Sequence, residues 1–183
     1  MRVIAGTARS LPLKAPEGLD TRPTTDRIKE TLFNILQPEV SQSIFVDLFS
    51  GSGAIGIEAL SRGAKKAYFI ENSAKACKCI GDNLSFTKFN DCGILLKQDA
   101  ISGLHSISEK YVDIIFMDPP YDQGLELQAL KVLSTMPYVD ENTLIIVEAS
   151  LKMKPEELTE LGYEITKEKR YKTNQHFFLR IAK

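Results

Sequence analysis

Short apolar runs alternate with amphipathic stretches along most of this 183-residue chain. Five apolar runs lie at residues 44–46, 67–70, 93–96, 112–117 and 143–147, and helical stretches follow them at 55–62, 73–84, 100–107, 125–135 and 155–161. Runs of this length are typical of strands that are buried on both faces of a sheet. The alternation therefore predicts an α/β fold with a doubly wound, mostly parallel sheet and helices on both faces.

The two ends of the chain depart from this alternation. Residues 163–166 and 176–181 are strand-like with only a polar loop between them, so we expect a C-terminal hairpin that adds an antiparallel strand and completes a seven-stranded sheet. Residues 3–6 and 11–13 can pair across a turn, and the helix that follows can be capped by Thr24 or Thr25 and is expected to end at Pro38. We therefore expect a hairpin-and-helix extension at residues 1–38 and a main domain at residues 39–183.

Composition places the chain among ordinary globular proteins, with 26% charged residues, 43% apolar residues and a formal net charge of -1. No apolar stretch approaches the about 20 residues that span a bilayer, and the first residues lack a secretory apolar segment, so we expect a cytoplasmic protein without a membrane partner. Cys77, Cys79 and Cys92 lack the spacing of metal ligands, which indicates reduced thiols and no metal site. Basic residues gather in 1–14 and 166–183, where phosphate contact and plain solvation are both open.

The sequence Asp118-Pro119-Pro120-Tyr121 directly follows the apolar run at 112–117. Its carboxylate can accept hydrogen bonds from an amine, its two prolines fix the backbone direction, and its tyrosine offers a flat face for stacking a base. An Asp-Pro pair alone is more often a simple turn. The four residues together at a strand end favour a site that orients the NH2 group of a nucleobase.

A glycine-rich loop follows the first core strand. Its spacing, Gly51-x-Gly53-x-x-Gly56, matches a dinucleotide fingerprint, and Glu71 ends the next strand where an acid can accept ribose hydroxyls. NAD and S-adenosylmethionine both contain such a nucleoside. Asp47 places a negative charge at the strand tip, which disfavours a pyrophosphate and suits an ammonium and a sulfonium, so the charge favours S-adenosylmethionine.

Two acids near this loop have more than one interpretation. Asp99 follows the third strand, where it can accept a hydrogen bond from an adenine amino group or cap the helix that begins near Ala100, and the two roles can coexist. Glu71 can also be an exposed acid at a strand end, although its position favours the ribose role.

The segments 22–36, 47–53 and 118–121 resemble the S-adenosylmethionine-dependent methyltransferases with a Rossmann-like sheet, and more narrowly the bacterial 16S ribosomal RNA guanine-N2 methyltransferases of the RsmD type. The resemblance covers nearly the whole chain, and 22–36 is its most specific segment. It implies methylation of the exocyclic amine of a flipped-out guanine, guanine 966 in the family, and we expect the protein to be a monomer. The substrate it implies is 16S rRNA or an assembly intermediate of the small ribosomal subunit.

Residue roles are also implied by this resemblance. The methyl donor would be held by Asp47, Phe49, Ser50, Gly51, Gly53, Glu71, Asn72, Asp99, Ala100 and Asp118. The target amine would be bound by Asp118 and the Pro119 carbonyl, with Pro120 fixing the corner and Tyr121 stacking on the base. RNA would be contacted by Arg2, Arg9, Lys14 and Arg22.

Other functions stay open at this point. The same motif serves adenine-N6 and glutamine-N5 methylases, the glycine spacing also fits an NAD-dependent oxidoreductase, and a non-catalytic RNA-binding module could keep the fold. In a methylase, Asp118 is expected mainly to orient the amine, because an unperturbed Asp pKa of ~3.9 makes a weak base near neutrality. We place His105 and His176 outside the site, at a helix end and at a strand start.

Overall fold

The seven predicted strands form one sheet in the computed structural model, which describes residues 1–16 and 26–182. The strands are β1 (Ile44–Leu48), β2 (Lys66–Ile70), β3 (Gly93–Leu96), β4 (Ile114–Met117), β5 (Leu144–Ser150), β6 (Tyr163–Arg170) and β7 (Asn174–Ile181). Their order is β3-β2-β1-β4-β5-β7-β6. β1 to β5 are parallel, and β7 lies antiparallel between β5 and β6, so the predicted fold class is confirmed.

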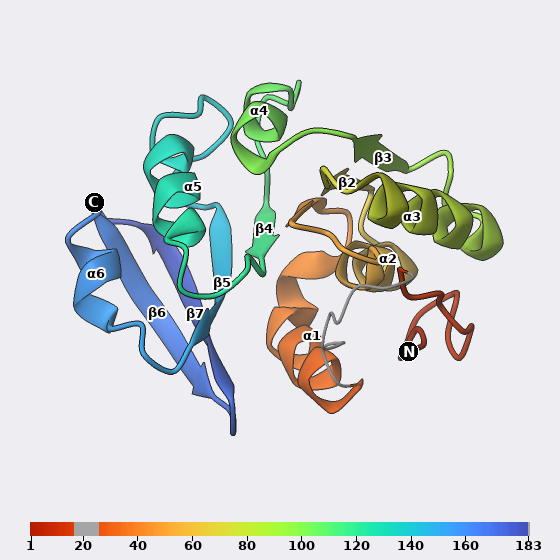
Figure 1. Cartoon of the computed structure of the whole chain (residues 1–183), viewed down its shortest axis with the longest axis horizontal. Helices are drawn as coiled ribbons and strands as arrows, with labels where there is room; N and C mark the ends of the chain where they lie inside the picture. Colours follow the sequence, from red (N-terminus) through yellow and green to blue (C-terminus); the bar gives the residue numbers. More distant parts are fainter. Residues whose placement is uncertain (17–25, 183) are drawn as a thin grey trace.

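Helices cover both faces of this sheet (Figure 1). They are α1 (Asp26–Val40), α2 (Ala54–Ser61), α3 (Ala74–Thr87), α4 (Ala100–His105), α5 (Leu125–Leu133) and α6 (Pro155–Thr159). Buried residues of α1, α2 and α3 share one apolar cluster with alternate residues of the strands, and those of α4, α5 and α6 share the other. None of the described helices is long and apolar enough to cross a membrane.

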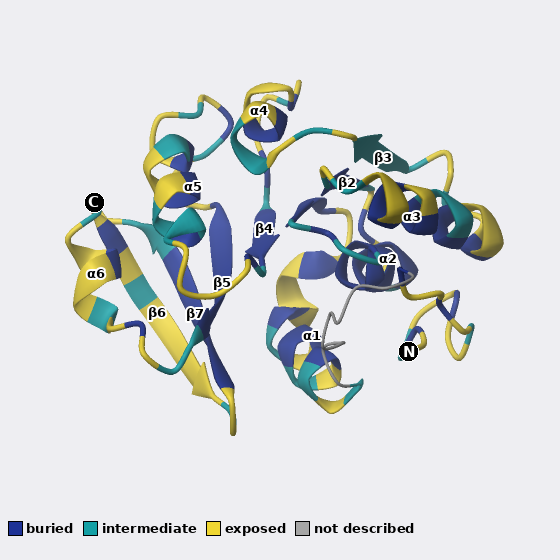
Figure 2. Ribbon diagram, in the orientation of Figure 1, coloured by how far each residue is buried: buried dark blue, intermediate teal, exposed yellow. Residues whose placement is uncertain are grey.

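The outer strand β6 is longer than its apolar pattern predicted. It runs to Arg170, although most of its residues beyond Tyr163 are exposed (Figure 2). An edge strand needs only one neighbour to satisfy its inward backbone groups, and β7 supplies that neighbour along the whole hairpin. The second half of β6 therefore consists of polar residues, which the apolar pattern could not identify as a strand.

The prediction that Pro38 ends the first helix is wrong, because α1 continues to Val40. Proline removes one N–H donor, and here the carbonyl that loses its partner belongs to Asn34, which is exposed. Val40 is buried in the core, so its packing stabilises the last turn. The predicted caps Thr24 and Thr25 lie outside the described residues.

The N-terminal segment packs on α2 instead of forming a full hairpin. Arg2 and Pro12 form an antiparallel bridge, so the predicted pairing exists, but it does not extend into strands. Backbone N–H groups between residues 4 and 8 donate instead to the Glu58 carboxylate and to the carbonyl and hydroxyl of Ser61. Gly6 is required at this approach, because a Cβ there would lie 1.8 Å from the Ser61 carbonyl oxygen.

A buried charged cluster joins this segment to α1 and α2. Glu58 is fully buried, and its carboxylate lies 3.4 Å from Lys29 Nζ and 2.8 Å from Arg62 Nε. Lys29 also donates to the Arg2 carbonyl, and burial lowers the pKa of its ammonium. The extension therefore shares its packing with the main domain, and the division at residue 38 stays a prediction.

Candidate active site

Two carboxylates meet at the carboxyl ends of the neighbouring strands β1 and β4. Asp47 lies within β1, and Asp118 directly follows β4, on the sheet face that carries Phe45 and Phe116. Both line a cavity of about 130 Å³ together with Phe49, Ser50 and Gly51 of the glycine-rich loop. The structure therefore brings these five predicted site residues together at the sheet edge where α/β folds bind ligands.

The extension closes this cavity from the other side, with Met1, Ala15, Pro16 and Lys29 among its lining residues. None of these four was predicted, because no sequence pattern indicates that the N-terminal segment folds back over the ends of β1 and β4. The cavity is therefore shared between the predicted extension and the main domain.

The glycine-rich loop is shaped by backbone geometry that favours glycine. Gly51 and Gly53 have positive φ angles of 55° and 77°. A Cβ at Gly51 would meet nothing within 4 Å, so its missing side chain leaves the cavity edge open, whereas a Cβ at Gly56 would lie 2.4 Å from Phe69. Gly53 does not line the cavity, and its role is to turn the chain into α2.

Asp47 is a buried carboxylate with few partners. It is 2% exposed, and one of its oxygens accepts a hydrogen bond from the Gly56 N–H at 2.9 Å. Burial raises its pKa to about 8, and repulsion from Glu71 acts in the same direction. A cationic ligand would stabilise the ionised form of this carboxyl, whereas a pyrophosphate would disfavour it. The donor set therefore fits an ammonium and a sulfonium.

Glu71 ties the glycine-rich loop to the end of β2. One carboxylate oxygen accepts from the Gly51 N–H, and the other accepts from the N–H groups of Asn72 and Ser73, all at 2.9 Å. A carboxylate offers about four acceptor positions, so these three bonds leave room for a further donor. Glu71 does not line the cavity itself, and the ribose role stays a prediction.

Asp99 caps α4, as one of its two interpretations predicted. Its carboxylate accepts from the backbone N–H of Ser102 at 3.0 Å and from the Ser102 hydroxyl at 2.6 Å, and these bonds lower its pKa. Ala100 opens the helix. The predicted contact with adenine is compatible with this cap and stays untested.

The Pro-Pro-Tyr corner follows β4 as predicted. Asp118 is only partly accessible, and burial raises its pKa well above the usual range, with further contributions from Glu148 and Asp47. Tyr121 is 40% exposed, so its ring is open to solvent while its hydroxyl donates to Glu148 Oε1 at 3.2 Å. Pro119 is buried and Pro120 exposed. The corner thus combines a partly buried carboxylate with an exposed aromatic residue.

The two histidines, which the sequence placed outside the site, differ in their surroundings. His105 is exposed at the end of α4, but His176 is fully buried, with Nε2 3.0 Å from Glu148 Oε2. Because Glu148 binds the hydroxyl of Tyr121, His176 belongs to the surroundings of the corner. The acid at the end of the apolar run of β5 marks Glu148 in the sequence, but nothing there marks His176 as its partner.

The predicted RNA contacts lie on the outside of the extension. Arg2, Arg9 and Lys14 are exposed, with Arg2 paired to Asp26 at 3.1 Å and Lys14 paired to Asp82 at 3.2 Å. Exposed pairs of this kind contribute little and exchange readily for other anions. Arg22 lies outside the described residues.

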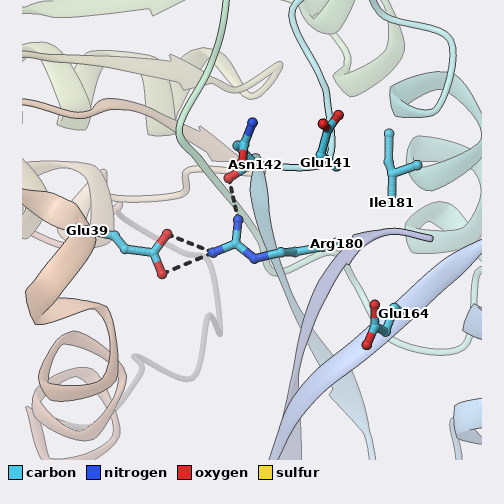
Figure 3. A pocket seen from close by; sticks show the side chains of 6 residues that line it. All are labelled: Glu39, Glu141, Asn142, Glu164, Arg180 and Ile181. Atoms are coloured by element: carbon cyan, nitrogen blue, oxygen red, sulfur yellow. Dashed lines mark hydrogen bonds and ion pairs between the residues drawn. The ribbon is translucent and has the colours of Figure 1, made fainter. Parts of the chain in front are cut away.

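A second cavity, of about 420 Å³, lies at the other end of the parallel strands, and Figure 3 shows the residues that line it. Its acidic residues, Glu39, Glu141 and Glu164, surround Arg180, which already donates to Glu39 and to the Asn142 carbonyl. Asn142 precedes β5, so this cavity lies at the amino ends of the parallel strands, away from the edge where such folds bind ligands. The cavity beside Asp47 is therefore the better candidate.

Known proteins resemble the chain over nearly its full length. A family model described as conserved hypothetical protein 95 matches residues 1–180. Ribosomal RNA small subunit methyltransferase D of Haemophilus influenzae is 39% identical over 173 residues, which cover 92% of this chain and 88% of that protein. The protein of that name from Escherichia coli K12 is 35% identical over 152 residues, 83% and 76% of the two chains. The solved structure of Escherichia coli yhhF has a TM-score of 0.84 and 32% identity, and the match covers 100% of this chain and 98% of that one.

Proposed function

Because the chain belongs to the family described as conserved hypothetical protein 95, the RsmD family of small-subunit rRNA methyltransferases, we propose that it methylates 16S rRNA with S-adenosylmethionine as donor. The finer proposal is transfer to the exocyclic N2 amine of a guanine, position 966 in the family. The observation that supports it most is the meeting of Asp47 and Asp118 in one cavity, where a cationic donor and a target amine would lie side by side.

The donor would be held by the residues around the glycine-rich loop. Asp47 would attract its ammonium, Glu71 would accept a ribose hydroxyl, and Asp99 would accept the adenine amino group. When bound, S-adenosylmethionine supplies a methyl group on a positively charged sulfur. The loop backbone at Gly51 leaves the space for its close approach.

The target amine would be gripped by Asp118 and the Pro119 carbonyl. The lone pair of an exocyclic amine is delocalised into the ring, and two acceptors on its hydrogens draw the nitrogen toward a pyramidal geometry that frees the lone pair. Tyr121 would stack on the extruded base, which returns about 1–3 kcal/mol against the cost of unstacking it.

The pKa of Asp118 bears on its role in the transfer. An unperturbed carboxyl is a weak base near neutrality, but burial and two nearby carboxylates raise the pKa of Asp118 well above the usual range. We therefore assign Asp118 a second role, as acceptor of the proton that the methylated amine loses.

A methyl-transfer assay tests this function. Tritiated donor is incubated with unmodified 16S rRNA or small-subunit particles, and the labelled nucleotide is mapped. We expect one labelled guanine, loss of transfer in Asp118→Ala, and donor binding by calorimetry that survives in that variant. Asp122→Ala, an exposed acid of the same loop, serves as the matched control. Label on another nucleotide would contradict the guanine assignment, and full turnover of Asp118→Ala would contradict the assigned chemistry.

A further inference from the structure

A row of polar side chains crosses the sheet behind the Pro-Pro-Tyr corner. Glu148 of β5 pairs in register with His176 of β7, and Asp118 follows β4 on the next strand. All three lie on the same sheet face, because Phe116, Ile146 and Phe178, two residues away along their strands, share one apolar cluster. Titratable side chains therefore replace apolar residues where this face reaches the candidate active site.

Three neighbours hold the Glu148 carboxylate, which is 5% exposed. Asn174 Nδ2 donates to Oε1 at 2.6 Å, the Tyr121 hydroxyl donates to Oε1 at 3.2 Å, and His176 Nε2 lies 3.0 Å from Oε2. Asn174 and His176 are buried, so their positions are fixed by packing. Among these partners Tyr121 alone is exposed, and its hydroxyl interacts with both Glu148 and Asn174.

The His176 ring is itself held from several sides. It makes edge contacts with Phe116 and Phe178, at centroid distances of 6.0 Å and 6.4 Å, and its Nδ1 lies 3.4 Å from the Tyr171 hydroxyl. The ring therefore has little freedom to turn, and it fixes the side of the Glu148 carboxylate that it contacts. Because the carboxylate is rigid, Oε1, which accepts the hydrogen bond from the Tyr121 hydroxyl, is held in place as well.

We propose that Glu148, held by His176 and Asn174, is a positioning residue that fixes the Tyr121 ring in the orientation that receives the extruded base. This inference rests on the proposed function, because it assigns the residue that prepares the stacking surface for the RNA base. A half-exposed tyrosine on a loop samples several rotamers, and anchoring its hydroxyl removes that freedom before the base arrives. Glu148 does not touch the reacting atoms in this role.

The first test changes each partner of the Tyr121–Glu148 hydrogen bond in turn. Tyr121→Phe keeps the stacking ring but loses the hydroxyl, and Glu148→Gln keeps the shape but loses the charge. We expect each variant to raise the KM for rRNA by about tenfold, as for a missing hydrogen bond to a charged group, with donor binding unchanged. Tyr121→Phe removes the hydrogen bond, and Glu148→Gln leaves a weaker, neutral one. Because both changes act on the same interaction, the double variant should lose much less than the product of the two single effects.

Matched controls exist at the other edge of the sheet. Glu109 also binds a tyrosine hydroxyl and a basic group, Tyr68 and Lys66, so Glu109→Gln is the counterpart of Glu148→Gln. Tyr111 is 54% exposed, and Tyr111→Phe is the counterpart of Tyr121→Phe. Both controls should keep the wild-type KM for rRNA. Wild-type KM in Tyr121→Phe, or fully multiplicative effects in the double variant, would overturn the inference, since Glu148 would then act through Asp118 or through stability alone.

A measurement without turnover separates this inference from the proposed function. In protein with 13C-labelled tyrosine rings, Tyr121→Phe identifies the Tyr121 signals, and Glu148→Gln should shift or broaden them while Glu109→Gln leaves them unchanged. Unaltered Tyr121 signals in Glu148→Gln would overturn the inference even in an active enzyme. Absence of wild-type methyl transfer would contradict the proposed function alone.

Discussion

Asp47→Asn is expected to stabilise the free protein while it removes donor binding. The wild-type carboxyl is buried with one hydrogen bond, and its pKa is raised to about 8 from an ordinary value of 3.8. The folded protein therefore keeps a proton on Asp47 at neutral pH that the unfolded chain has released. Asparagine occupies the same volume, can still accept from the Gly56 N–H, and has no proton to hold.

The magnitude follows from proton linkage. A group whose pKa is raised on folding contributes stability that is complete below its unfolded pKa, near 4, and that is lost as the pH rises toward 8. One extra bound proton changes the free energy of unfolding by about 1.4 kcal/mol per pH unit. The stability of Asp47→Asn relative to wild type should therefore rise by about 3 kcal/mol between pH 5 and pH 7.

Urea unfolding of the donor-free protein at pH 5, 6 and 7 measures this difference. Asp91→Asn, the same change at an exposed aspartate, is the control and should run parallel to wild type. Parallel profiles for Asp47→Asn and wild type would refute the reasoning, because they would mean that Asp47 is ionised in the folded protein. Calorimetry with S-adenosylmethionine at pH 7 should detect no binding to Asp47→Asn, despite its higher stability.

Two further sets of changes test the N-terminal extension. Glu58→Gln should destabilise the protein by about 3–5 kcal/mol in urea unfolding, because it leaves Lys29 buried without its counter-charge, and limited proteolysis should then cleave the first 16 residues earliest. Replacing the exposed basic residues of the extension by glutamine should weaken rRNA binding and reduce the slope of log affinity against log salt by about 0.7–0.9 for each phosphate that they neutralise, and an unchanged slope would exclude them from the RNA interface. The residues to replace are Arg2, Arg9 and Lys14.

The sheet could be predicted because its inner strands are buried on both faces. β1, β4 and β5 consist almost entirely of buried residues, so their apolar runs mark them without help from the rest of the chain. Once a parallel α/β order is established, the ends of β1 and β4 must lie at one edge, and Asp47 and Asp118 follow as neighbours. The length of β6 depends on its pairing with β7, and the end of α1 depends on the packing of Val40. The apolar pattern of the sequence shows neither.

The contacts around Glu148 could not be predicted from the sequence, for a different reason. Two of its partners, Asn174 and His176, come from β7, which enters the sheet antiparallel beside β5. A pairing of residues 148 and 176 therefore requires the register of a long-range hairpin. A histidine at a strand start carries no signal by itself, and only that register places it against a buried carboxylate. The residue types at strand ends were enough to indicate the site. The contacts of Glu148 that lie behind it depend on how β5 and β7 pair in the folded protein.

The raised pKa values of Asp47 and Asp118 bear on which ligand the cavity binds. Asp47 and Asp118 line one cavity, and the raised pKa of each has burial as its first cause, to which the charge of neighbouring carboxylates adds. A positive charge in the cavity opposes both effects, because it attracts ionised carboxylates and lowers their pKa values. A cationic ligand beside Asp47 therefore also favours the ionised form of Asp118, the form that accepts hydrogen bonds from an amine. These two buried carboxylates therefore make the cavity selective for a cation next to an amine.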